Sequence, residues 1–280
     1  MVTQETLNFL FSLLHKESGL ALDDSKTYLI ETRLDPIARK EGFSSINDLG
    51  RHMKQNPSQP LRQKVIDAMM TNETSFFRDI KPFELLKGVV LPDLIKANEK
   101  GRRIRIWTAG CSTGQEPYTI AMLLCEMAPA LHQWEIRILA TDIAEGALER
   151  ARAGIYSQYE VQRGLPVTYL TRFFNQRKTE WEIKQEVKRL VEFQRLNLLS
   201  GFSHLGIFDV IFCRNVLIYF DAGTKVRIME QFAHILSSRG VLFLGGAETP
   251  FGITGEFIRI EMEKGVCYKK NTLSNKVQSK

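Results

Sequence analysis

Four segments that should follow buried strands consist of small or polar residues. They are residues 110–114 (GCSTG), Asp142, Asn197 with Leu198, and Arg214 with Asn215. In open α/β sheets, ligands bind outside the carboxyl ends of the strands, near the point where the strand order reverses. The four segments together therefore predict one crevice that holds a ligand.

The loop at 110–114 and the acids near it restrict the kind of ligand. Gly110 and Gly114 let the backbone turn tightly and approach a ligand, but the loop matches neither G-x-x-x-x-G-K-[ST] nor G-x-G-x-x-G. Glu116 stands at the start of the next helix, where its carboxylate would repel a phosphate. The alternative interpretation is an ordinary acid in a first helical turn. Asp142 could accept hydrogen bonds from two ribose hydroxyls, and a cationic nucleoside without phosphate describes S-adenosylmethionine (SAM).

A second polar run, TNETSFFR at residues 71–78, lies where the helical pattern of the N-terminal part ends. We expect Phe76 and Phe77 to belong to the core between two domains. Arg78 is either a surface residue or a group that holds a carboxylate, because a guanidinium binds carboxylates through two parallel hydrogen bonds.

The elements that must position these residues follow from hydrophobic periodicity. Before residue 75 the apolar residues recur only at helical spacing, which predicts a small helical bundle. From residue 104 onward, short apolar runs alternate with helical patterns, which predicts a mostly parallel, doubly wound sheet. The last two apolar runs have no room between them for a crossover helix and predict an antiparallel hairpin. The expected strands lie at 104–109, 136–141, 191–196, 208–213, 241–245, 257–260 and 266–269, and the expected helices at 117–127, 145–152 and 221–236.

The chain should therefore be an α/β protein with an all-helical N-terminal domain. Residues 154–190 are far longer than the usual connection of about 2–6 residues, and Trp181 and Ile183 among charged neighbours suggest a small β hairpin with a helix. This stretch is either an inserted subdomain or an ordered excursion without function. The expected divisions are a helical domain at 1–75, a linker with a lead-in helix at 76–103, an α/β domain at 104–270 and a basic tail at 271–280.

Composition excludes several classes of protein. The net charge is +6, but Lys269, Lys270, Lys276 and Lys280 lie at the C-terminus without acids, so we do not expect nucleic-acid binding. The four cysteines are far apart, which argues against a disulfide framework or a zinc site, and we expect no metal. No segment reaches the ~18 apolar residues of a membrane span. We expect a cytoplasmic protein without membrane insertion.

The motifs resemble those of the CheR family, the SAM-dependent glutamate O-methyltransferases of chemotaxis receptors. The likeness covers nearly the whole chain. The runs that carry it are TNETxFFR at 71–78, GCSTGQEPY at 110–118, ATDI at 140–143, GIY at 154–156, NLL at 197–199 and FCRNVLIYFD at 212–221.

This resemblance implies a set of site residues. Arg78 and Tyr219 would lie near the transferred methyl group as catalytic residues. The residues expected to contact SAM are Asn72, Thr74, Arg78, Gly110, Glu116, Asp142, Asn197, Leu198, Arg214 and Asn215.

The resemblance also implies partners. The acceptor would be a glutamate on a cytoplasmic methylation helix of a chemoreceptor, giving a γ-glutamyl methyl ester and S-adenosylhomocysteine (SAH). Arg33 and Arg39 match the basic residues that meet this helix. The inserted segment corresponds to a β-subdomain that in some members binds a pentapeptide at the receptor C-terminus. Here the stretch from Phe174 to Phe193 is shorter and lacks their glycine-rich turn, which argues against such tethering. We expect a monomer.

Two other functions stay open at this point. A SAM methyltransferase could act on another acceptor, such as RNA or a small acid, although the chain lacks the [ND]-P-P-[YF] signature of amino-group methylation. A non-catalytic module that senses SAM or organises receptors is the alternative outside the enzymes.

Overall fold

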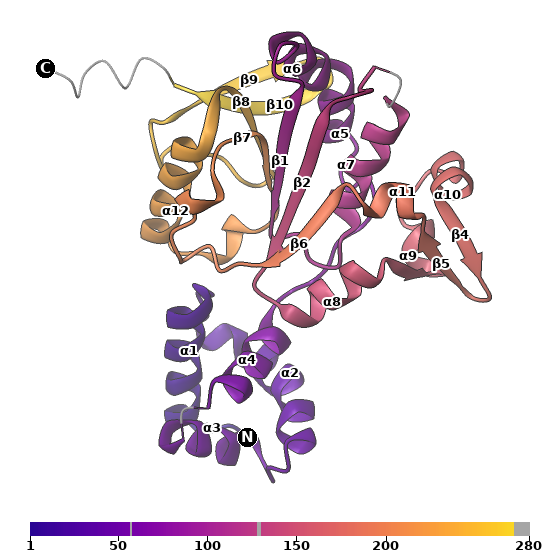
Figure 1. The fold of residues 1–280 in the computed structure, drawn as a ribbon. Coiled ribbons are helices and arrows are strands. Elements are labelled where there is room, and N and C mark those ends of the chain that lie inside the picture. Colours follow the sequence, from indigo (N-terminus) through magenta and orange to yellow (C-terminus); the bar gives the residue numbers. More distant parts are fainter. Residues whose placement is uncertain (57, 128–129, 272–280) are drawn as a thin grey trace, which may run out of the picture.

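The computed structural model describes residues 1–56, 58–127 and 130–271. Residues 272–280, nearly all of the expected basic tail, lie outside the described residues. The remainder forms an N-terminal helical bundle, a central sheet with helices on both faces, and a small second sheet beside it (Figure 1).

The helical bundle predicted from the apolar periodicity before residue 75 is present. Ser45 caps one helix by accepting a hydrogen bond from the N–H of Asp48, and the apolar stripes meet in a single core that includes Leu10, Leu34 and Val65. Figure 1 shows the bundle below the main sheet. Its elements are α1 (Gln4–Ser18), the 3₁₀ turn η1 (Asp24–Lys26), α2 (Thr27–Lys40), α3 (Ile46–Gln55) and α4 (Gln59–Met69).

The main sheet has seven strands in the order β6-β2-β1-β7-β8-β10-β9. The strands from β6 to β8 are parallel, whereas β10 pairs antiparallel with both β8 and β9, as the hairpin prediction requires. Along the chain, β2 and then β6 are added on one side of β1, and β7 then pairs with β1 on its other side. The strand order therefore reverses between β1 and β7. The strands are β1 (Arg103–Ala109), β2 (Glu135–Asp142), β6 (Val191–Arg195), β7 (Phe208–Cys213), β8 (Leu236–Leu244), β9 (Phe257–Met262) and β10 (Gly265–Lys270).

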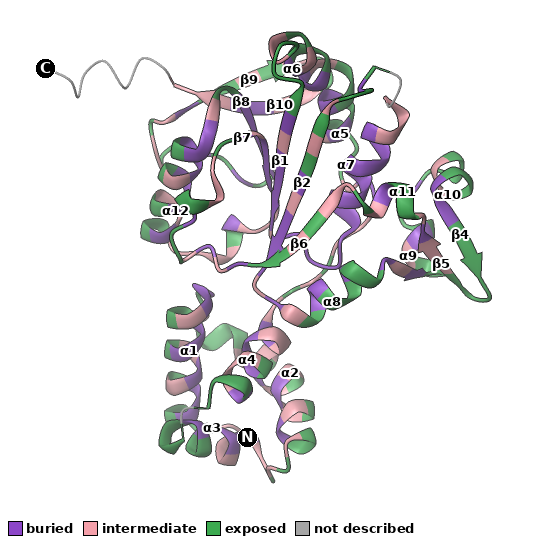
Figure 2. Ribbon diagram, in the orientation of Figure 1, coloured by how far each residue is buried: buried purple, intermediate pink, exposed green. Residues whose placement is uncertain are grey.

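Alternating side chains of these strands enter two separate cores. Ile106 and Phe212 face one core with α5 (Lys81–Leu85), the π-helical turn η2 (Leu86–Val90), α6 (Leu91–Ala97) and α7 (Gln115–Glu126). Trp107 and Ile211 face the other core with α12 (Ala222–Ile235). Figure 2 shows the central strands buried between these layers. The predicted fold class is confirmed: an all-helical N-terminal domain and a mostly parallel, doubly wound sheet.

The inserted segment contains more strands and helices than the predicted hairpin and single helix. A three-stranded antiparallel sheet in the order β3-β5-β4 projects to one side with short helices around it (Figure 1). The prediction missed β3 because three residues show no readable alternation. After α8 (Glu145–Ala153), its elements are β3 (Ile155–Ser157), α9 (Gln158–Gln162), α10 (Val167–Phe173), β4 (Phe174–Arg177), β5 (Glu180–Ile183) and α11 (Gln185–Lys188).

Phe76 and Phe77 are buried, but not between the two domains as expected. Phe76 packs edge-on against Tyr156 and Phe174, and Phe77 packs against Phe83 and other rings of the same core. Both rings therefore fix the 71–78 run to the α/β part and its insertion. The expectation failed because a buried aromatic pair does not reveal which of two neighbouring cores it enters.

Among the described residues, no helix is both long and apolar enough to cross a membrane, and no three His, Cys, Asp or Glu side chains gather in a group that could hold a metal ion. The four cysteines carry free thiols, and burial raises the pKa of Cys111 and Cys213 far above the ordinary value.

Candidate active site

A pocket with about 950 Å³ of empty space opens between the helical bundle and the carboxyl ends of β1, β2, β6 and β7. It lies where the strand order reverses, which is the usual place for a ligand in such sheets. Every residue expected to contact SAM or to lie near the methyl group lines it: Asn72, Thr74, Arg78, Gly110, Glu116, Asp142, Asn197, Leu198, Arg214, Asn215 and Tyr219.

The loop after β1 turns in a way that only glycine permits at its first residue. Gly110 has a φ of 76°, and a Cβ atom there would lie 2.4 Å from Cγ2 of Val216. The loop then joins two other walls of the pocket. The N–H of Ser112 donates to Oδ2 of Asp142 (2.8 Å), and the Ser112 hydroxyl donates to the carbonyl of Asn72 (2.8 Å).

Asp142 is buried at the end of β2, with 8% of its surface exposed. Its Oδ2 accepts from Ser112 N–H, and its Oδ1 accepts from Ala144 N–H at 3.0 Å. Each oxygen keeps a second lone pair, so ribose hydroxyls are still compatible with this carboxylate. Burial raises the pKa of Asp142, although these backbone hydrogen bonds oppose the increase.

Binding of SAH should therefore weaken on the acid side at a higher pH than an ordinary carboxyl would cause. If Asp142 binds the ribose, as the SAM hypothesis predicts, its protonation as pH falls through the raised pKa would remove acceptor capacity for the hydroxyls. Calorimetric titration of SAH between about pH 4.5 and about pH 8 measures this limb, because an ordinary Asp titrates near 3.9. Asp142→Asn should weaken binding throughout and remove the limb. An unchanged limb in that variant would assign the titration to another group.

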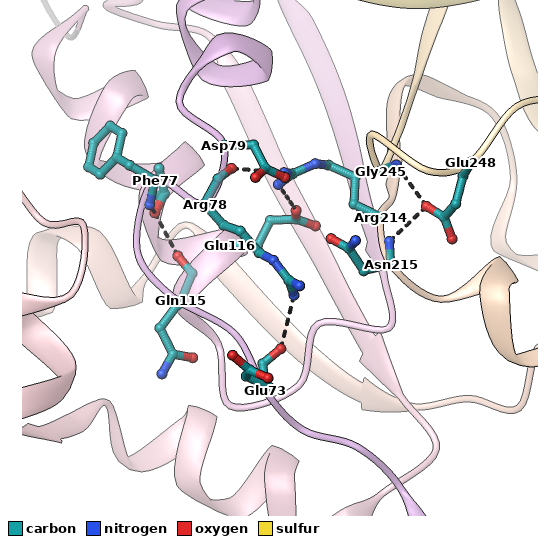
Figure 3. Close-up of polar contacts among 11 residues, drawn as sticks. Glu73, Phe77, Arg78, Asp79, Gln115, Glu116, Arg214, Asn215, Gly245 and Glu248 are labelled. Atoms are coloured by element: carbon teal, nitrogen blue, oxygen red, sulfur yellow. Dashed lines mark hydrogen bonds and ion pairs between the residues drawn. The ribbon is translucent and has the colours of Figure 1, made fainter. Parts of the chain in front are cut away.

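Glu116 stands in the first turn of α7 and is paired, not free. Its Oε2 accepts from Nη1 of Arg214 at 2.8 Å, while Nη2 of Arg214 reaches Oδ2 of Asp79 at 2.7 Å and the carbonyl of Arg78 at 2.8 Å (Figure 3). The Arg214 side chain is only 2% exposed. Burial raises the pKa of Glu116, and the Arg214 guanidinium opposes this.

This pairing corrects the charge argument. The carboxylate of Glu116 was expected to repel phosphate and favour a cation, but Arg214 balances its charge inside the same pocket wall. A single acid at a helix start therefore cannot select the ligand's charge here. The alternative interpretation of Glu116, an ordinary acid in a first helical turn, is confirmed, because Glu116 lies in the first turn of α7.

Arg78 keeps most of its hydrogen-bonding capacity. Its Nη1 donates to the carbonyl of Glu73 at 3.0 Å, and its other N–H groups have no hydrogen-bond or ion-pair partner in the part of the chain that the structure describes. The flanking residues Phe77, Asp79 and Ile80 have φ values of 49°, 65° and 38°. Such residues cost about 1–3 kcal/mol each and persist only where surrounding contacts hold them. Here the Arg214 side chain supplies contacts to Arg78 and Asp79.

Two other pocket residues also join the bundle to the sheet. Asn197 donates from Nδ2 to the carbonyl of Glu17 at 2.6 Å, and its Oδ1 accepts from Leu199 N–H. The carbonyl of Tyr219 accepts from Ala21 N–H at 3.0 Å. The end of α1 is thus attached to the loops after β6 and β7, which closes the pocket on that side.

Arg33 and Arg39, expected to meet a receptor helix, lie outside the pocket. Arg33 donates to the carbonyl of Met69 at 2.6 Å and to the hydroxyl of Thr71 at 3.1 Å, so it also holds the connection to the 71–78 run. Arg39 pairs with Asp35 on an exposed turn of α2.

Sequence reasoning missed Asp79 and Glu248. Glu248 follows β8, the next parallel strand, and its buried carboxylate accepts hydrogen bonds from the loop after β7. The rule applied to the first four strands would have found it, because β8 also ends in small and polar residues (GGAE at 245–248). Asp79 had no comparable signal.

Comparison with known proteins agrees with this architecture. Residues 5–70 match the family description "CheR methyltransferase, all-alpha domain", and residues 72–266 match "CheR methyltransferase, SAM binding domain". Chemotaxis protein methyltransferase 1 of Vibrio cholerae is 41% identical to this chain, and the alignment covers 91% of this chain and 93% of that protein. Chemotaxis protein methyltransferase 1 of Pseudomonas aeruginosa is 40% identical, with coverage of 91% and 94%. Chemotaxis protein methyltransferase Cher2 of Pseudomonas putida is 38% identical, with coverage of 91% and 94%. The chain therefore belongs to the CheR family of SAM-dependent chemotaxis methyltransferases.

Proposed function

We propose that this protein transfers the methyl group of SAM to glutamate side chains on the cytoplasmic helices of chemotaxis receptors, producing γ-glutamyl methyl esters and SAH. The observation that carries the choice of acceptor is Arg78. It is a guanidinium with N–H groups left over, on the wall of the pocket that Tyr219 also lines. Such a group binds a carboxylate. Family membership and the names of the relatives support the chemotaxis receptor as the source of that carboxylate.

The pocket residues fit SAM. Asp142 has lone pairs for ribose hydroxyls, and Oδ1 of Asn215 is buried without a hydrogen-bond partner in the described structure, as expected for an acceptor that a ligand completes. Asn72, Thr74, Leu198 and the Gly110 turn would enclose the rest. When bound, SAM supplies an electrophilic methyl group on a sulfonium.

The residues of this chain then need only to position and desolvate the acceptor. A glutamate has a pKa of about 4.3, so it is ionised at neutral pH and no general base is required. Arg78 would hold a carboxylate, either that of the acceptor or that of the methionine moiety, and Tyr219 would line the path of the methyl group. Transfer requires the acceptor oxygen about 3–3.5 Å from the methyl carbon and in line with the sulfur. The helical bundle over the pocket would exclude water.

The partner and the division of the chain follow from this function. Residues 1–75 would face the receptor, with Arg33 and Arg39 toward its acidic methylation helix, and residues 104–270 would carry out the transfer, joined by 76–103. The protein would act as a monomer in the cytoplasm, where those helices lie. The short stretch between β4 and β6 still argues against tethering through a receptor pentapeptide.

Labelling tests this function directly. Incubation with methyl-tritiated SAM and receptor membranes should label the receptors, and mild base should release the label as methanol, because carboxyl methyl esters hydrolyse in base. Label that resists base would indicate amino-group methylation. Binding of SAH without any labelling would indicate a sensing or organising module.

A further inference from the structure

The carboxylate of Glu248 accepts hydrogen bonds from five backbone N–H groups. Its Oε2 accepts from the N–H groups of Asn215 and Gly245, both at 2.7 Å. Its Oε1 accepts from the next three N–H groups of the same loop, those of Val216 (2.9 Å), Leu217 (2.7 Å) and Ile218 (3.3 Å). Consecutive N–H groups that converge on one anion form a concave binding site, and hydrogen bonds to a carboxylate are about twice as strong as neutral ones.

The loop that these hydrogen bonds hold combines a left-handed residue with a tight turn. Asn215 has a φ of 57°, in the left-handed region, and the next residues tighten into the 3₁₀ turn η4 (Leu217–Tyr219). Gly245, which follows β8, lies so close to this loop and to Glu248 that it has no space for a side chain. A Cβ atom on Gly245 would lie 2.7 Å from Oε2 of Glu248 and 2.8 Å from the nitrogen of Asn215. The carboxylate therefore joins the carboxyl ends of β7 and β8 through its hydrogen bonds to Asn215 and Gly245 (Figure 3).

The same loop forms a wall of the pocket. Asn215, Val216, Tyr219 and Phe220 line it, whereas Glu248 does not. Val216 lies against the Gly110 turn, and the carbonyl of Tyr219 accepts from Ala21 of the helical bundle. Any displacement of this loop would move the pocket wall and the tyrosine together.

We propose that Glu248 is a positioning residue for methyl transfer: its carboxylate sets the course of residues 215–219 and through them places Tyr219 and the cofactor wall. It acts through the loop and touches no reactant. The activity part of this inference rests on the proposed function, but its binding part needs only the cofactor pocket.

Glu248→Gln tests the proposal because it preserves shape and changes hydrogen bonding. The amide has one donor end, so either the pair of N–H groups at Oε2 or the three at Oε1 would face an NH₂ group. We expect SAH binding, measured by calorimetry, to weaken about tenfold, and kcat to fall about tenfold as well. Glu248→Asp keeps two acceptor oxygens but is one methylene shorter, and it should fall between the glutamine variant and the wild type.

Asp209→Asn is the matched control, at the opposite end of β7. Asp209 also accepts a hydrogen bond from a backbone group, the N–H of Arg105 at 3.0 Å, and a second one from the side-chain hydroxyl of Ser237. This variant should lower stability toward urea without changing SAH affinity or kcat. Equal losses of SAH affinity in both variants would reduce Glu248 to a general stabilising residue and overturn the proposal, as would wild-type binding and kcat in Glu248→Gln.

A double-mutant cycle with Tyr219→Ala separates positioning from stability. Once the ring is absent its placement no longer matters, so Glu248→Gln should reduce kcat by a much smaller factor in that background. Multiplicative losses would contradict the proposal. If Glu248→Gln does not fold, Gly245→Ala crowds the same carboxylate and should weaken SAH binding about tenfold. If the wild type binds SAH but labels no receptor, the proposed function fails while the binding measurements still decide the role of Glu248.

Discussion

Arg78→Ala is expected to lower kcat/KM for receptor methylation by about 10²-fold or more, because the carboxylate that we propose Arg78 holds would no longer be aligned for transfer. Arg78→Lys keeps the charge but not the planar pair of donors, and should recover only part of the activity. The measurement is the initial rate of base-labile labelling of receptor membranes. SAH affinity measured in parallel shows which carboxylate Arg78 holds: unchanged affinity assigns it to the acceptor, and weakened affinity to the methionine moiety.

Arg163→Ala is the appropriate control for this experiment. Arg163 pairs with Oε1 of Glu73, the residue whose carbonyl accepts from Arg78, but its side chain is 47% exposed and it does not line the pocket. Removing it changes the charge near the same segment, and the rate should stay close to that of the wild type. Wild-type kcat/KM in Arg78→Ala would refute the assigned role.

Arg214→Ala should produce the largest loss of stability. It removes the only guanidinium within hydrogen-bonding distance of Glu116 in the described structure and leaves that buried carboxylate uncompensated. Breaking a buried ion pair in this way costs about 3–5 kcal/mol of unfolding free energy. The contacts to Asp79 and to the carbonyl of Arg78 disappear at the same time, so the strained segment at 77–80 should relax and activity should be lost. Urea unfolding monitored by circular dichroism measures the first effect.

A double variant distinguishes an unpaired charge from a lost contact. Arg214→Met combined with Glu116→Gln leaves no buried charge at this place and should recover much of the stability, but not the activity. For comparison, Arg152→Ala breaks the partly exposed pair with Glu145 and should cost no more than about 1 kcal/mol. A loss in Arg214→Ala no larger than that of Arg152→Ala would show that the buried pair contributes little.

The fold was largely predictable because hydrophobic periodicity reports local structure. Strand β7 lies where it was expected, and the predicted helix after Asp221 begins with that residue as its cap. The antiparallel closing hairpin followed from the connection between its two strands, which is too short for a crossover helix. The inserted segment was the weakest part, since strands of three or four residues carry too few alternations to be recognised, and β3 pairs with a strand more than twenty residues away.

The amino-acid sequence by itself determined that the residues following the strands share the pocket. Polar residues that follow parallel strands meet at one edge of a sheet, so Asp142, Asn197 and Asn215 had to converge once the strands were recognised. It could not decide how those side chains are used. Glu116 and Arg214 are 98 residues apart in the chain, and only folding brings them together and cancels their charges. The tertiary structure likewise decided that Asn197 holds the helical bundle and that Glu248 holds the loop of Tyr219, because hydrogen bonds between distant segments depend on distances that periodicity does not encode.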